Sequence, residues 1–197
     1  MASFQERSIS AFKGQLTGGG TRSNLFEVDI TFPTSVGNNL ILSEKVNFLV
    51  KAAEIPASNL GNIPVPYRGR VLPIAGDRTF DPWTVTVIND TDFLIRDAME
   101  RWSNSINDLQ TAQGLVDPAA YQTSADVKQL SRKGDGPGIS EPILRQYRFE
   151  GIYPNVVSSI PLDFGATDQI EEFQVTFNYL FYEVTIPAVS AELTQGG

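Results

Sequence analysis

The stretch AGDRTFDPWTVTVIND, residues 75–90, has two halves of different character. In the second half, one set of positions holds Trp83, Val85 and Val87, and it alternates with Thr84, Thr86 and Ile88. This period of two predicts a half-buried β-strand. The first half places charged side chains beside a glycine and a proline: Asp77, Arg78 and Asp81. It predicts a charged loop, whose charges either take part in chemistry or hold an assembly together.

Length and composition indicate a folded domain. The chain has 197 residues, of which 41% are hydrophobic, enough to bury a core of its own. An aromatic content of 10% with 19% charged residues is not typical of a disordered chain. The net charge of −8 argues against non-specific DNA binding, which needs Lys and Arg to displace the counterions of the phosphates.

Two residue types are missing from the sequence, because it contains neither cysteine nor histidine. Thiolate nucleophiles, zinc sites built from Cys or His, and imidazole proton transfer are therefore excluded. The first ten residues, MASFQERSIS, lack the apolar region of a secretory signal, and no stretch approaches the roughly 20 apolar residues of a membrane helix. We expect no export signal and no membrane association.

The N-terminal half predicts strands and one proline-rich projection. A short helix is expected over residues 4–16 and a break at glycines 18–20. Residues 24–32 alternate as a half-buried strand, and residues 40–55 predict one or two more. Residues 67–72 are polar and lie among four prolines, a pattern typical of an edge strand or a projecting loop.

The C-terminal half contains the clearest helix, over residues 90–109, with Asp90 or Thr91 as its expected cap. Its predicted apolar stripe is Phe93, Leu94, Ala98 and Trp102. Residues 125–130 are expected to pair with 143–151 across a turn at 134–138, and 151–163 to form a kinked link. Residues 170–186 give the longest strand signal, with Phe173, Val175, Phe177, Tyr179, Phe181 and Glu183 on one face. The predicted fold class is mainly β: an antiparallel β-sandwich or barrel with one flanking α-helix.

No pattern in the chain favours an enzyme. Asp77 and Asp81 flank a turn beside Arg78, whereas catalytic carboxylate pairs converge from different strands. The glycines at 134–138 lack the GK[ST] ending of a phosphate-binding loop, and residues 163–168 lack the ligand ladder of a calcium loop. Ser158 and Ser159 have no histidine to activate them. We expect no catalytic residue, no cofactor and no metal site.

Several blocks of the sequence resemble the tail tube proteins of contractile-tailed, myovirus-type bacteriophages. The most diagnostic is Gly76-Asp77-Arg78-Thr79 followed by Trp83, within the stretch quoted above and ahead of DFLIRDAMERW at 92–102. The other blocks are NLFEVDI (24–30), KAAEIPASNLGNIPVPYRGR (51–70), FEGIYPNVV (149–157), IPLDF (160–164) and IEEFQVTFNY (170–179). The resemblance covers residues 24–182 and departs from the family at 34–45, at 134–138 and after Glu183.

The resemblance implies a structural subunit of the virion, assembled in the cytoplasm of the bacterial host. Such subunits form hexameric rings that stack head to tail into a hollow tube, as in type VI secretion and related contractile injection systems. An extended arm or hairpin would complete a barrel built from several subunits. The implied partners are other copies of the chain, the tail sheath protein, the baseplate tube initiator and the tail terminator. DNA would pass through the lumen during ejection without specific binding.

The resemblance also divides the chain and assigns roles to residues. It implies an N-terminal helix or arm (1–23), a tail tube β domain (24–186) and a flexible C-terminal tail (187–197). The candidates for subunit interfaces are Arg68, Arg70, Asp77, Arg78 and Asp81. The expected core anchors are Trp83, Trp102, Phe173 and Phe177.

Other interpretations stay open at this point. The chain could instead form the inner tube of a phage-derived injection system, or initiate or terminate a tail tube. The acidic balance either keeps DNA from adhering to the channel wall or is ordinary solubility charge. A carbohydrate-binding or hydrolytic β-sandwich is disfavoured, because Trp83 and Trp102 lie in patterns typical of core positions.

Overall fold

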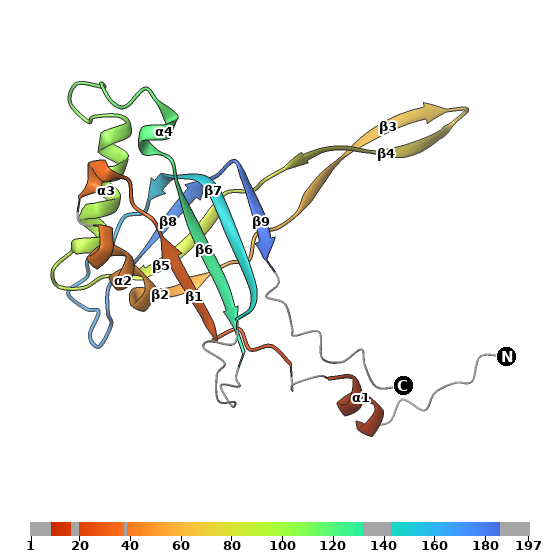
Figure 1. Ribbon diagram of the computed structural model, residues 1–197, viewed down its shortest axis with the longest axis horizontal. Helices are drawn as coiled ribbons and strands as arrows, with labels where there is room; N and C mark the ends of the chain where they lie inside the picture. Colours follow the sequence, from red (N-terminus) through yellow and green to blue (C-terminus); the bar gives the residue numbers. More distant parts are fainter. Residues whose placement is uncertain (1–8, 17–19, 38, 132–142, 186–197) are drawn as a thin grey trace, which may run out of the picture.

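A computed structural model describes residues 9–16, 20–37, 39–131 and 143–185 (Figure 1). Within these residues, seven strands form one antiparallel sheet with the strand order β1-β6-β7-β8-β5-β2, in which β9 also pairs with β7. A separate two-stranded ribbon, β3 with β4, projects from it as an arm (Figure 1). The strands are β1 (Phe26–Ile30), β2 (Val50–Ala53), β3 (Asn59–Tyr67), β4 (Arg70–Thr79), β5 (Trp83–Ile88), β6 (Thr123–Leu130), β7 (Ile143–Val157), β8 (Glu172–Asn178) and β9 (Phe181–Thr185).

The long strand β7 divides this sheet into two layers. Its first half pairs with β6 and β9, and its second half pairs with β8. Gly151 lies between the halves with φ of 68°, a left-handed conformation that favours glycine. The mainly β fold with antiparallel pairing is therefore confirmed. The predicted strand 143–151 and kinked link 151–163 are in fact one strand as far as Val157.

The core lies between the two layers and follows the predicted alternation. In β5, Trp83, Val85 and Val87 are buried, and in register they face Phe177, Val175 and Phe173 of β8. On the other layer, β1 and β6 contribute a similar row of buried side chains: Val28, Ile30, Ala125 and Val127. Trp102 comes from a helix and is also fully buried, so all four expected core anchors lie in the core.

The helices are α1 (Ile9–Gln15), the 3-10 helix η2 (Thr34–Val36), α2 (Asn39–Leu49), α3 (Leu94–Ile106) and α4 (Pro118–Tyr121). Helix α3 flanks the sandwich and buries Ile95, Ala98, Met99 and Trp102 (Figure 1). The predicted stripe was wrong at Phe93, which precedes the helix in a left-handed conformation and remains 43% exposed. The predicted cap was also wrong, because the carboxylate of Asp92 accepts the backbone N–H of Leu94.

Residues 40–55 do not form strands alone, as the sequence had predicted. They form α2 as far as Leu49, and only Val50–Ala53 is a strand. Apolar side chains lie on every side of this helix, so neither the period of 3.6 nor the period of two is clear in the sequence. The helix lies along the open edge of β1, where the Ser43 hydroxyl donates to the carbonyl of Ile30.

The predicted strand over 170–186 is two strands, because the chain turns at Tyr179 and Leu180. This interruption reverses the alternation: Tyr182 lies opposite Phe149 in the pairing with β7, while Phe181 and Glu183 belong to the other, exposed face. The N-terminal helix is present as α1, but it buries no residue. Phe4, the turn at 134–138 and the tail 187–197 lie outside the described residues. Within the described ranges, none of the helices has the length and apolar character needed to cross a membrane.

Candidate functional site

The projecting arm is the most unusual feature of the fold. Strands β3 and β4 pair with each other from Tyr67 opposite Arg70 down to Asn59 opposite Thr79. Arg68 and Gly69 form the two-residue turn at the tip, both with positive φ, as in the turns that match the twist of a β-ribbon. Proline is tolerated here because each strand of a two-stranded ribbon is an edge. The arm is the projection that the prolines predicted.

The arm exposes apolar side chains along its length. Nearly every residue of β3 and β4 is exposed, because in the part of the chain that is described these strands pair only with each other. The exposed apolar residues are Leu60, Ile63, Val65, Tyr67, Val71, Leu72 and Ile74. Ile63 pairs with Ile74 and Val65 with Leu72, so these four side chains share one face of the ribbon. An exposed apolar patch of this kind marks an interaction site.

The tip of the arm is positively charged. Between residues 59 and 76 the only charged side chains are Arg68 and Arg70. The Arg68 guanidinium lies 5.3 Å from the centroid of the Tyr67 ring, a cation–π contact that holds it at the tip. The arm therefore combines an apolar shaft with a cationic end.

The charges at the base of the arm serve local structure rather than one another. Arg78 donates through Nη1 to the Ser58 hydroxyl at 2.5 Å, and Asp81 accepts the Asn59 amide N–H. Asp77 lies on β4 next to Arg78, and within the described ranges no ion pair joins Asp77, Arg78 and Asp81. The two hydrogen bonds connect the beginning of β3 to the end of β4, where the arm leaves the sandwich.

Two glycines bring the arm strands close together just beyond this base. A Cβ on Gly61 would lie 3.2 Å from the carbonyl oxygen of Asp77, and a Cβ on Gly76 would lie 3.2 Å from the Gly61 backbone. The pairing register shifts at the same place, between Leu60 and Asn62. The arm thus has a narrow root, built where larger side chains would push its strands apart.

Behind the root, Trp83 anchors β5 in the core. Its indole Nε1–H donates to the Glu54 carbonyl at 2.9 Å, and its ring stacks on Phe149 with 4.5 Å between centroids. Phe80, just before β5, packs against Tyr179 and Tyr182. The arm therefore emerges from a rigid aromatic cluster.

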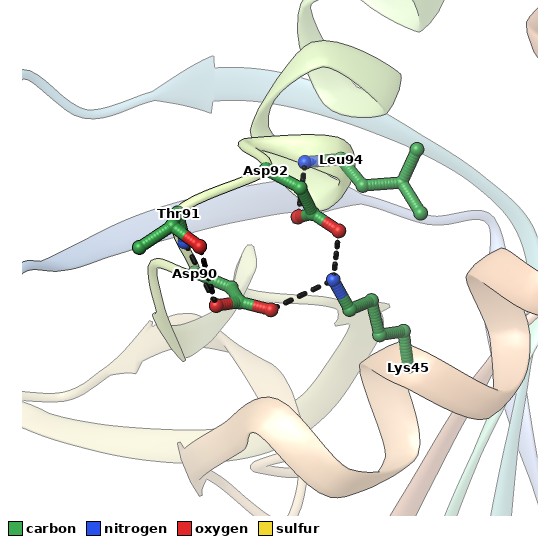
Figure 2. Close-up of polar contacts among 5 residues, drawn as sticks. All are labelled: Lys45, Asp90, Thr91, Asp92 and Leu94. Carbon is green, nitrogen blue, oxygen red and sulfur yellow. Dashed lines mark hydrogen bonds and ion pairs between the residues drawn. The ribbon is translucent and has the colours of Figure 1, made fainter.

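A second charged cluster, on the helical side, was not predicted from the sequence (Figure 2). Lys45 of α2 donates to Asp90 at 2.8 Å and also to Asp92. Asp90 further accepts the N–H of Thr91, and Asp92 that of Leu94. These hydrogen bonds, above all those from the lysine, lower the pKa of both carboxyl groups, and the bond to Asp90 with that to Asp92 raises the pKa of Lys45.

No local sequence pattern indicates this cluster, because 45 residues separate Lys45 from Asp90 and residues 40–55 were expected to be strands. The only signal was the position of Asp90 ahead of a helix, which predicted a cap at Asp90 or Thr91. Among the described residues, no group of three carboxylates is arranged to hold a metal ion. The candidate functional sites are therefore two surfaces. One is the apolar arm with its cationic tip, and the other is the charged cluster of Lys45, Asp90 and Asp92 beside the helices.

Comparison with known proteins identifies the family. Residues 21–185 match the model of a family described as phage tail tube protein. The chain is 31% identical over 171 residues to the tail tube protein gp19 of Enterobacteria phage T4, a match that spans 85% of this chain and 93% of gp19. It is 26% identical over 174 residues to the tail tube protein of Serratia phage KSP90, covering 87% of this chain and 94% of that protein.

Solved structures share the fold at much lower identity. A chain of the anti-feeding prophage baseplate, described as 6-fold symmetrised, superposes with a TM-score of 0.56 at 11% identity, over 84% of this chain and 95% of that one. A chain of the PVC sheath-tube complex, an extracellular contractile injection system, gives a TM-score of 0.52 at 12% identity, over 92% and 99%. The architecture is common to these assemblies, and the sequence match over most of its length shows that the chain belongs to the phage tail tube protein family.

Proposed function

We propose that the chain is the repeating subunit of a phage tail tube, in which six copies form a ring and rings stack head to tail around a channel. The arm is the observation that carries this proposal. It exposes more than half of the surface of Leu60, Tyr67 and Val71 to solvent, although an apolar ribbon of this size gains stability only when it is covered. Membership of the tail tube family makes another copy of the chain the natural cover.

Open strand edges support closure of a barrel between subunits. In the described part of the chain, β2 pairs with β5 alone, and each arm strand pairs only with the other. A strand left at an edge exposes unpaired N–H and C=O groups, and a closed barrel removes such edges. The ring would pair these edges with strands of neighbouring subunits. Contacts between rings would be heterologous and therefore extend into a tube.

The channel would carry DNA into the host cell during ejection. The net charge of −8 suits a wall along which DNA slides without binding, because carboxylates repel phosphates within a Debye length of about 8–10 Å. One outward face of the sandwich carries Glu27, Asp29 and Asp126, with Lys128 bonded to Asp29 at 2.7 Å. The opposite outward face is neutral around Thr84 and Thr176, whose hydroxyls lie 3.2 Å apart.

A binding measurement on assembled tubes tests the proposed role of charge. Polyphosphate binding is compared between wild-type tubes and tubes that carry Glu27→Lys with Asp126→Lys, or Glu172→Lys on the other face. Charge reversal on the face that lines the channel is expected to raise polyphosphate binding. Equal binding by all three tubes would leave the acidic charge with no role in DNA passage.

The partners follow from the same proposal. The tube would lie inside a tail sheath, start on a baseplate initiator and end at a terminator, and the assembled protein would be part of the virion. The fold supports this placement, since it recurs in a baseplate, a tube cap and a sheath-tube complex. The same likeness favours the second candidate, the inner tube of a phage-derived injection system, whose channel would hold a protein. We propose no catalytic activity for either.

Negative-stain electron microscopy of the purified chain at high concentration, in low and in raised salt, tests the proposed function. Hollow tubes or six-fold rings are the expected result. If only monomers are present, a baseplate fraction is added to supply the initiator. Monomers that fail to grow into tubes even then would contradict the proposal.

A further inference from the structure

We propose that the tip of the arm docks on the outer face of helix α2 in a neighbouring copy of the chain. The outer face of α2 consists of Leu40, Ile41, Glu44 and Phe48. This inference rests on the proposed self-assembly and names the two surfaces that meet. It follows from what the single chain leaves uncovered on each side.

Helix α2 is apolar on both of its long faces. Leu42 and Val46 lie in the core, yet on the opposite side Leu40 is 74% exposed and Phe48 is 85% exposed. Residues four positions apart lie one above the other on a helix, so Leu40, Glu44 and Phe48 form one continuous stripe. Helices that are apolar all round are normally buried, and this outer stripe therefore needs a cover.

The arm is the matching apolar surface, and it points away from its own α2. Figure 1 shows α2 and α3 at one end of the molecule and the arm extending from the other. A ribbon of nine or ten residues per strand is about 30 Å long. The arm therefore reaches well beyond its own sandwich, and the α2 face that it can cover belongs to another copy.

The charges of the two surfaces are complementary. The tip carries two positive charges, Arg68 and Arg70, and the arm has no acidic residue between 59 and 76. Glu44 lies within the α2 stripe, and Asp90 and Asp92 lie beside it, bonded to Lys45. These four side chains together carry two net negative charges. The side chains of Asp90 and Asp92 are 46% and 49% exposed, so both carboxylates can accept from a guanidinium. Opposite charges of this kind fix the register of a contact.

The contact has a direction, because the donor surface and the acceptor surface are different parts of one chain. Each copy offers an arm to one neighbour and an α2 face to another. Such a contact is heterologous, and it builds a ring or a filament rather than a closed pair. The docked tip would place Leu72 beside Phe48 and Arg70 beside Glu44, because residues two positions apart on a strand lie on the same face of the ribbon.

Disulfide trapping tests this pairing directly, because the chain contains no cysteine. A chain with both Leu72→Cys and Phe48→Cys is assembled and then oxidised. If the tip docks on α2, the double-cysteine variant gives a ladder of covalent oligomers on a non-reducing gel. Each single-cysteine variant remains a monomer on the same gel. The control pair is Leu72→Cys with Phe164→Cys, since Phe164 is fully exposed on the β7–β8 connection. We expect no ladder from this control.

A charge exchange supplies the second measurement. Arg70→Glu and Glu44→Arg, each alone, are expected to reduce the fraction of chain in tubes severalfold, and the double variant to restore it. Arg70 is chosen because Arg68 packs on Tyr67 and has a positive φ. Two results would overturn the docking and leave the tail tube function standing: tubes that form normally while the Leu72–Phe48 cysteine pair gives no ladder, or a charge-exchanged double variant without rescue. Wild-type protein that never assembles would overturn both.

Discussion

The indole ring of Trp83 stacks on the phenyl ring of Phe149, with 4.5 Å between the centroids and 21° between the ring planes. Trp83 belongs to β5 and Phe149 to the first half of β7, so the stack joins the two layers of the sandwich. Both rings are almost fully buried. The contact lies behind the root of the arm, and it therefore links the core to the surface that we propose mediates assembly.

Removal of the Trp83 ring should destabilise the subunit strongly. We expect Trp83→Ala to lower the free energy of unfolding by about 3–5 kcal/mol, through lost burial and the cavity that remains. Trp83→Phe keeps an aromatic ring but leaves the Glu54 carbonyl without its indole donor, at a cost of about 1–3 kcal/mol. Urea unfolding of the unassembled protein measures both values.

A double-mutant cycle isolates the stack itself. Trp83→Ala and Phe149→Ala, alone and combined, should show a coupling of about 0.5–1.5 kcal/mol. Phe164→Ala serves as the control, because this ring is fully exposed and its removal should change stability by less than about 0.5 kcal/mol. Strict additivity of the two core changes would mean that the rings contribute by burial alone.

Gly151 should not tolerate a side chain. Its φ of 68° costs other residues about 1–2 kcal/mol, and an added Cβ would lie 2.7 Å from the side chain of Leu180. Because β7 passes between the layers here, Gly151→Ala is expected to destabilise the fold by about 1–3 kcal/mol. The matched control is Gly14→Ala, in the exposed helix α1 with nothing nearby, which should not destabilise the protein. Equal urea midpoints for the two variants would contradict the role of Gly151.

How far the sequence predicts this fold depends on the element. Alternation located β5 and β1 well, because each buries one face and leaves the other partly exposed. The prolines around residue 67 located the arm for an equally local reason. Helix α2 was missed because its outer face is as apolar as its inner face, which the subunit alone does not explain. If that outer face is an interface between subunits, the wrong strand prediction has a physical cause. The apolar residues of α2 then reflect contacts between subunits as well as contacts within one.

The charge cluster escaped prediction for a different reason. Lys45 meets Asp90 and Asp92 only because α2 packs beside the connection between β5 and α3 (Figure 2). No local pattern relates residues this far apart in the chain. Conversely, the charges that stood out in the sequence, Asp77 and Arg78, form no ion pair with each other in the described structure. The sequence predicted a charged loop here, but both residues lie on the extended strand β4, where neighbouring side chains point to opposite faces.

The Lys45 cluster should make stability depend on pH at the acidic end. The pKa values of Asp90 and Asp92 lie below the ordinary 3.8, so their contribution is present above that pH and is lost as the pH falls through the lowered values. The pKa of Lys45 is raised above 10.5, so its contribution is lost only as the pH rises beyond that value. The difference in free energy of unfolding between wild type and Lys45→Met should therefore become smaller below about pH 4.

Urea midpoints measured from pH 2 to pH 8 test this expectation. Lys13→Met, in the exposed helix α1, makes the same change in net charge and controls for it. The gap between Lys45→Met and wild type should be constant from about pH 5 to pH 8 and shrink in acid. A gap that stays the same down to pH 2 would show that the cluster contributes nothing through its charges.

Removal of the arm should separate folding from assembly. Residues 62–75 are replaced by Asn-Gly, the two-residue turn that suits a tight hairpin between Gly61 and Gly76. Because the deleted residues are almost all exposed, the sandwich should keep its cooperative unfolding and its free energy of unfolding to within about 0.5 kcal/mol. Electron microscopy should show no tubes from this variant under conditions in which wild type forms them.

Matched controls decide whether the loss of tubes comes from removal of the arm or would follow from any change of the exposed apolar surface. Leu109→Ser and Val116→Ser each remove a side chain that is more than 90% exposed on the connection between α3 and α4. Both variants should assemble like wild type, because that connection lies away from the arm (Figure 1). Tubes from the shortened chain would show that the open edges of the sandwich suffice for assembly, and the arm would then need another partner. Failure to fold would instead place the arm in the folding of the subunit, against the exposure of nearly all its residues.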